Sequence, residues 1–290
     1  MEVQLHTPLC DPHRVTKLKG LIYALCNYDH PFWTLLAYDD NRPHDLIMTT
    51  IIKGILDPDD MVGNENLNTI YVSDFECECI WKIDIDKNSV TVWLSELDRD
   101  FSLSVTSVDH LLVIRWFQDP PYLEIYNKDA ELLRMISLSY DFTGPLVGVQ
   151  KPNGEFVLSH ESHFGPLISI LDSDGKLISQ PSLDTDYFQA RVQLFVDTQD
   201  DNLLVTDTKE GNRCLLDMKT LKLSPIDCLF EPNFAIRHTR SVTFYYDGKR
   251  KQLIRIHRSR VDILALGKGT TAKSNDECEA LAWALAMADP

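Results

Sequence analysis

The residues best suited to bind another molecule lie in one basic segment between Asn233 and Asp262. The segment holds eight basic side chains and two acidic ones, a local charge of +6 in a chain whose formal net charge is −16. Aromatic residues, Phe244 to Tyr246 among them, are interleaved with the basic ones. Positive charge beside aromatic platforms suits single-stranded nucleic acid, and positive charge alone suits an acidic protein surface. The candidate partner-binding residues are therefore Arg237, Arg240, Lys249, Arg250, Lys251, Arg255, Arg258 and Arg260.

Three interpretations of this basic segment stay open. Its side chains pair with acidic neighbours inside the fold or are merely solvated, they bind an acidic protein partner, or they bind RNA. The net charge of −16 and the pI near 4.9 repel phosphate backbones overall, which disfavours nucleic acid. We therefore expect a protein partner, and RNA binding is the alternative.

Two short motifs hold residues that ligate metals in other proteins. His160, Glu161 and His163 form H-E-x-H, one residue shorter than the H-E-x-x-H spacing that puts two imidazoles on one helix face. Because this motif falls at an expected strand end, we expect a polar strand-to-loop corner. Cys77 and Cys79 form a C-x-C motif without a second pair, and strand alternation turns both thiols to the same side. Ordinary thiols are expected there, with a redox or metal site as the alternative.

An acidic stretch, DPDDMVGNENLN, begins at Asp57 and superficially resembles a calcium-binding loop. Its acidic residues do not follow the ordered D-x-[DN]-x-[DN]-G spacing with a terminal glutamate. We expect an exposed, solvated loop and no metal site at Asp57, Asp59, Asp60 and Glu65.

Six similar runs of β-branched and aromatic residues organise the chain. Their starts are 48, 41, 45, 47 and 50 residues apart. A repeat of this length in a strand-rich sequence is typical of four-stranded β-propeller blades. The runs are Leu21 to Asn27, Thr69 to Phe75, His110 to Trp116, Glu155 to Ser162, Asn202 to Lys209 and Gln252 to Ser259.

The turn chemistry around these runs completes the expected architecture. Hairpin turns rich in Asp, Asn and Lys follow these runs and mark further short strands. The sequence predicts an all-β, six-bladed β-propeller of four-stranded antiparallel blades over residues 1–266. Its last blade lacks an outer strand, and Glu2 to Pro8 is expected to supply it, because an open ring leaves edge strands unpaired. In the tail, residues 267–290, capping-box spacing predicts a short helix over about 275–287.

These repeats resemble the NHL family, the propellers of tripartite-motif NHL ubiquitin ligases. The resemblance lies in IYVSD (70–74) followed by IWKID (80–84), in LLVTDTKEGNRCLLD (203–217) with its Asn212–Arg213 pair, and in RKQLIRIHRSRVDIL (250–264). It implies a rigid disc whose faces recognise protein segments or, in some members, RNA. It also implies that ligase chemistry resides in a separate RING domain, for which this chain has no Cys/His series. We therefore expect a non-catalytic protein-interaction module or scaffold, such as the substrate-recognition part of a ubiquitin-ligase-type system.

A metal-dependent lactonase-like or esterase-like propeller hydrolase is the second alternative. Such an enzyme holds a divalent cation on carboxylate and amide oxygens in its channel. Glu161, Asn202 and Asp207 are conceivable contributors, but nothing in their spacing marks them as convergent. We expect no catalytic residue and no cofactor.

Composition indicates the compartment. Hydrophobic residues make up 44% and charged residues 25% of the 290 residues, as in globular proteins. The seven cysteines are scattered and odd in number, no run of 18 apolar residues occurs, and the N-terminus lacks an apolar signal region. A cytoplasmic protein that does not associate with membranes is expected.

Overall fold

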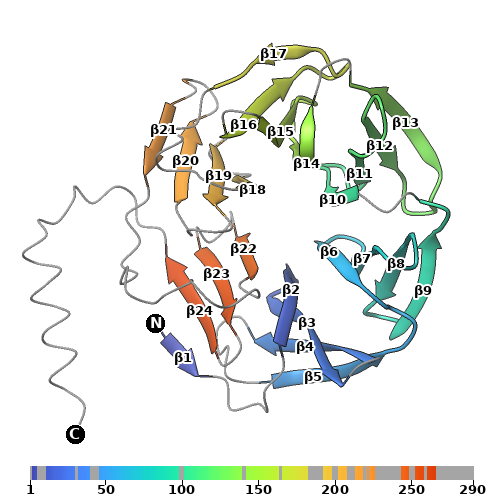
Figure 1. Cartoon of the computed structure of the whole chain (residues 1–290). Helices are drawn as coiled ribbons and strands as arrows, with labels where there is room; N and C mark the ends of the chain where they lie inside the picture. Colours follow the sequence, from blue (N-terminus) through green and yellow to red (C-terminus); the bar gives the residue numbers. More distant parts are fainter. Residues whose placement is uncertain are drawn as a thin grey trace, which may run out of the picture.

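A computed structural model describes most of the first two thirds of the chain and separate strands beyond it. The described residues are 2–4, 11–29, 32–39, 46–97, 101–138, 142–162, 165–181, 192–197, 202–207, 213–217, 220, 222–225, 243–247, 252–257 and 260–265. All regular structure within these residues is β-strand, arranged as six four-stranded antiparallel sheets around a ring (Figure 1). The arrangement is a β-propeller. The basic residues of the last repeat, the tail 267–290 and its expected helix lie largely or wholly outside the described residues.

Each sheet takes four strands in chain order, except the last. The first sheet holds β2 (Asp11–Leu18), β3 (Leu21–Asp29), β4 (Phe32–Asp39) and β5 (Leu46–Ile52). The second holds β6 (Pro58–Asn64), β7 (Thr69–Asp74), β8 (Cys79–Asp84) and β9 (Ser89–Leu94). The third holds β10 (Phe101–Val105), β11 (Leu111–Arg115), β12 (Tyr122–Tyr126) and β13 (Leu132–Ser137).

The remaining sheets follow the same plan. The fourth holds β14 (Thr143–Gln150), β15 (Phe156–Ser162), β16 (Gly165–Leu171) and β17 (Leu177–Ser179). The fifth holds β18 (Val192–Asp197), β19 (Asn202–Asp207), β20 (Arg213–Asp217) and β21 (Lys222–Pro225). The last holds β22 (Thr243–Asp247), β23 (Gln252–His257) and β24 (Arg260–Ala265), with β1 (Glu2–Gln4) at its outer edge.

The N-terminal strand joins the two ends of the chain. β1 pairs antiparallel with β24, with Val3 opposite Val261, as expected from the missing outer strand of the last repeat. The innermost strands contact their neighbours all the way round, from β2 through β6, β10, β14 and β18 to β22, and β22 contacts β2. The pairing therefore covers the edge of β24 and closes the ring, which removes one site of edge-to-edge association.

Apolar side chains fill the spaces between neighbouring sheets. One cluster packs Leu112 and Ile114 of β11 against Phe156 and Leu158 of β15. Similar clusters join the first sheet to the second, the second to the third and the fourth to the fifth. Every residue of β7 is buried, whereas most residues of the outermost strand β13 are exposed. This gradient explains the repeated apolar runs, because the second strand of each sheet lies between two covered faces and needs side chains that pack on both.

The acidic stretch from Asp57 is not the solvated loop expected from its composition. It forms β6, the innermost strand of the second sheet, and its two adjacent aspartates have partners on both sides. Arg14 on β2 forms an ion pair with Asp59 (Nη2–Oδ1, 3.1 Å). The Asp60 carboxylate accepts hydrogen bonds from the N–H groups of Leu103 on β10 (2.9 Å) and of Met61 (2.8 Å). These contacts join three consecutive inner strands, so poor strand formers are tolerated where their carboxylates have donors.

An aromatic seam joins the second and third sheets. Trp93 on β9 lies edge-to-face between Tyr71 on β7 and Tyr126 on β12, at ring-centroid distances of 4.9 Å and 5.9 Å. Its indole N–H donates to the carbonyl oxygen of Lys128 in the β12–β13 turn (3.0 Å). Since such pairs add to the energy of area burial, the seam holds two blades in a defined orientation.

A single turn residue offers a stabilising substitution. Ala130 has a φ of 63° and donates to the carbonyl oxygen of Asn127. Gly154 and Gly175 occupy the same place in turns of the same hydrogen-bond pattern. Because the left-handed region is unfavourable for residues with a Cβ, Ala130→Gly is expected to raise the free energy of unfolding by about 1 kcal/mol. Thermal unfolding would show a Tm higher by about 2 °C; an unchanged or lower Tm would contradict the assignment of strain.

Among the described residues, no helix has the length and apolarity needed to cross a membrane.

Candidate functional site

The structure describes only two of the eight candidate basic residues. Arg255 lies on β23 opposite Asp262 of β24. Arg260 begins β24, opposite His257 of β23 and Gln4 of β1. The two arginines therefore belong to one sheet, at the closure of the ring. The other six lie outside the described residues: Arg237, Arg240, Lys249, Arg250, Lys251 and Arg258.

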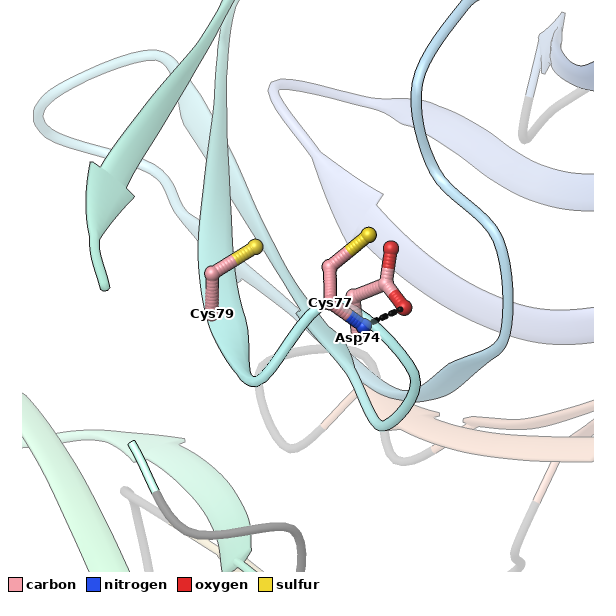
Figure 2. Close-up of side chains that lie close together, drawn as sticks. All are labelled: Asp74, Cys77 and Cys79. Atoms are coloured by element: carbon pink, nitrogen blue, oxygen red, sulfur yellow. Dashed lines mark hydrogen bonds between the residues drawn. The ribbon is translucent and has the colours of Figure 1, made fainter. Parts of the chain in front are cut away.

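A compact group of metal-ligating atoms lies in the turn between β7 and β8. The two sulfur atoms of Cys77 and Cys79 and a carboxylate oxygen of Asp74 all lie within 4.8 Å of one another (Figure 2). Asp74 ends β7, Cys77 lies in the turn and Cys79 begins β8. Asp74 and Cys79 are buried, and Cys77 is half-buried. The alternative considered for the C-x-C motif thus gains a third potential ligand.

Asp74 accepts four hydrogen bonds. Its Oδ1 accepts from the backbone N–H groups of Asp57 and Cys77, both at 3.1 Å. Its Oδ2 accepts from the N–H of Leu56 (2.9 Å) and from the indole N–H of Trp81 (3.1 Å). The donors belong to the β5–β6 connection, the β7–β8 turn and β8. One carboxylate therefore ties three segments together and is held in a defined orientation.

The surroundings change the pKa of each group in this turn. Burial alone raises the pKa of the Asp74 carboxyl, but the backbone hydrogen bonds outweigh it, and the resulting pKa lies below the ordinary value. Burial raises the pKa of Cys77 to about 11, and the hydrogen bond to Asp74 adds to the rise. Burial raises the pKa of Cys79 to about 12, with the charge of Asp74 as the next cause. Neither thiol is thus activated as a nucleophile at neutral pH.

His160 has a structural environment. It lies buried on β15, with its Nε2 2.9 Å from Ser169 Oγ and its ring edge-to-face with Phe142 at 4.8 Å. His160 and Glu161 therefore lie at the end of a strand, as expected. His163 lies outside the described residues.

The residues considered for a channel metal site do not all converge. Asn202 and Asp207 are the first and last residues of β19. At about 3.3 Å per residue they lie roughly 16 Å apart, near the two opposite faces of the disc. One ion cannot bind both. Glu161 lies on another sheet, opposite Thr143 of β14.

An exposed apolar strip on the outer rim was not predicted. Leu132, Leu133 and Met135 of β13 are 49%, 50% and 56% exposed. β13 is the outermost strand of its sheet, and a β-bulge interrupts its pairing with β12. Its apolar sequence does not by itself show whether the strand is buried or exposed. Only the order of strands in the sheet reveals that most of these side chains face solvent.

Comparisons with known proteins support the fold. No family model and no curated protein matches the sequence. Two solved β-propeller structures are similar to the chain, each with a TM-score of 0.58. Streptogramin B lyase is 11% identical, over 93% of this chain and 87% of its own. Hydrazine synthase of Kuenenia stuttgartiensis is 14% identical, over 95% and 83%. At these identities the likeness shows the β-propeller fold and no activity.

Proposed function

We propose that this chain is a non-catalytic binding module: a six-bladed, NHL-like propeller that presents its rim to a protein partner. In this proposal it acts in the cytoplasm, as a scaffold or as the substrate-recognition part of a ubiquitin-ligase-type system. Cys77 and Cys79 are free thiols although their sulfur atoms lie within 4.8 Å of each other, which suits a reducing compartment.

The exposed strip of β13 is the observation that carries the proposal. Outer strands of soluble proteins usually carry charged residues, because an apolar edge invites association. The outer strand β5 also exposes apolar residues, but on β13 two leucines and a methionine surround the exposed Arg134, which pairs with Asp174 at 2.6 Å. Apolar anchors surrounded by polar groups are typical of the centre of a protein interface. We therefore assign partner contact to Leu132, Leu133 and Met135.

The basic segment is a second, separate surface in this proposal. Figure 1 places β13 and the sheet of β22 to β24 on opposite sides of the ring. Charges act over about 8 Å at physiological salt, so Arg255 and Arg260 on that sheet do not steer a ligand docked on β13. These two arginines and the other six basic residues of the segment are proposed to bind an acidic region of the same or another partner.

Two observations support the non-catalytic assignment. In its favour, Asn202 and Asp207 lie at opposite ends of one strand and cannot share a channel cation. Also in its favour, the pKa of both thiols in the β7–β8 turn is raised, away from the activated state that nucleophilic catalysis needs.

A matched pair of rim variants tests the binding surface. Leu133→Lys/Met135→Lys places two charges on β13, where exposure keeps the cost to folding small. Ile47→Lys/Ile51→Lys makes the same change on β5, the outer strand of another sheet, where these residues are 53% and 63% exposed. Partners captured from lysate by the wild-type chain should bind the β13 variant more than tenfold more weakly and the β5 variant normally. Equal binding by all three chains would remove β13 from the site.

A further inference from the structure

We propose that Asp74, Cys77 and Cys79 form a binding site for one thiophilic divalent cation, such as Zn²⁺. The three potential ligand atoms lie within 4.8 Å of one another. Zn–S bonds of about 2.3 Å and Zn–O bonds of about 2.1 Å place the ligand atoms of one tetrahedral ion roughly 3.5 Å apart. Small side-chain rotations therefore bring the three atoms onto one ion. A thiolate pair with a carboxylate is a donor set that zinc accepts.

The hairpin turns the two sulfur atoms to the same side. Figure 2 shows both sulfurs pointing in the same direction as the Asp74 carboxylate, beside Cys77. Glu78, between the cysteines, has a φ of 51°, and its carbonyl oxygen accepts a hydrogen bond from the N–H of Leu97. The backbone of the turn is thereby held at the residue that sets the relative direction of the two thiols. The potential ligand atoms come from six consecutive residues, 74–79, of one hairpin.

The charge of the turn favours a cation. Glu76 and Glu78 flank Cys77, and Asp74 lies within reach of both sulfurs. A bound divalent ion offsets the negative charge of two thiolates and one carboxylate at short range. The backbone carbonyl oxygen of Gly54 lies 3.6 Å from the Cys77 sulfur. Either this oxygen or a water molecule is proposed as the fourth ligand of the ion. Carboxylates alone would suit a hard ion, whereas the two sulfurs select a thiophilic one.

The hydrogen bonds of Asp74 set the order of importance of the ligands. Backbone N–H groups orient this carboxylate, as outer-shell donors do in metal sites. Each of its oxygens already accepts two hydrogen bonds, so binding a cation requires one of them to lengthen. The two thiolates therefore supply most of the affinity, and Asp74 supplies less.

Cadmium titration of the full-length, reduced chain tests the site. Cd²⁺, like Zn²⁺, binds thiolate ligands and does so more tightly, and thiolate ligation gives an ultraviolet sulfur-to-cadmium charge-transfer band. We expect one equivalent to bind with this band and to be displaced by excess Zn²⁺. Cys77→Ala and Cys79→Ala should each weaken binding more than a hundredfold, and Asp74→Asn about tenfold. Cys214→Ala, which removes a buried thiol of β20, is the matched control and should bind normally.

Three results would overturn the proposal. One is a reduced wild-type chain that binds no Cd²⁺ with a charge-transfer band. Another is binding that persists undiminished in the Cys77→Ala/Cys79→Ala double variant. The third is a Cys77–Cys79 disulfide, detected by mass spectrometry, in a chain that binds no ion at this turn after the disulfide is reduced. Circular dichroism of each variant separates loss of the metal site from loss of the fold. Capture of a protein partner by the wild-type chain is measured in a separate experiment, so the two proposals can fail independently.

Discussion

Asp74→Ala is expected to lower the free energy of unfolding by about 3 kcal/mol or more, the largest effect of any single substitution considered. The change leaves four donors without their acceptor: the N–H groups of Leu56, Asp57 and Cys77 and the indole N–H of Trp81. A buried donor without a partner costs about 1–3 kcal/mol, and water can reach some of the four. Urea unfolding followed by tryptophan fluorescence would measure the loss as a lower midpoint at unchanged slope.

The pH dependence of this loss follows from the lowered pKa of Asp74. A carboxyl whose folded pKa lies below its unfolded value of about 3.9 stabilises the fold above that value. The ionic part of the stabilisation disappears as the pH falls through the folded pKa. The difference between wild type and Asp74→Ala should therefore shrink below about pH 4. Asp129→Ala, at an exposed turn aspartate, is the control and should change stability by less than about 0.5 kcal/mol; an equal effect of both substitutions would contradict the assigned role.

Glu124→Ala is expected to cost about 2–3 kcal/mol. Glu124 on β12 is buried, accepts a hydrogen bond from the Tyr126 hydroxyl (3.0 Å) and forms an ion pair with Arg115 (3.4 Å). Burial raises the pKa of Tyr126, and the negative charge of Glu124 raises it further. Removing the carboxylate leaves a largely buried guanidinium and a hydroxyl without this acceptor, and breaking a buried pair from one side is strongly destabilising.

A double substitution separates the charge of Glu124 from its volume. Arg115→Leu/Glu124→Leu removes both charges and fills the space with apolar atoms, which is often neutral or stabilising for buried ion pairs. Chemical unfolding should place the double variant closer to wild type than Glu124→Ala. A double variant that unfolds at lower denaturant than the single one would show that the pair itself stabilises the propeller.

The repeat period predicted most of the fold, because each blade buries its second strand between two neighbours. The runs starting at Leu21, Thr69 and Asn202 all form that strand, and the pairing of β1 with β24 follows from the missing outer strand. β6 was missed. Its aspartates disfavour a strand locally, and their partners, Arg14 and the N–H of Leu103, come from neighbouring sheets. Composition cannot show contacts that only ring closure creates.

The candidate sites were harder to predict from the sequence than the fold was. The C-x-C motif was visible, but its third potential ligand, Asp74, ends the preceding strand and joins the thiols only through the shape of the turn. The apolar sequence of β13 does not distinguish a buried strand from an exposed rim strand. The four hydrogen bonds to Asp74 could not be predicted from the sequence either, because their donors lie on three separate segments.

Salt-titrated capture from lysate, with bound protein and bound RNA both identified, tests the central claim that this propeller binds protein. The chains compared are wild type, Leu133→Lys/Met135→Lys, and a basic-segment variant with glutamate at Arg240, Lys249, Arg250 and Arg258. We predict a protein retained by wild type and lost from the rim variant, with a weaker, salt-sensitive loss in the basic-segment variant. Identical protein profiles for all three chains, or RNA enriched by wild type with a steep salt dependence and lost from the basic-segment variant, would contradict it.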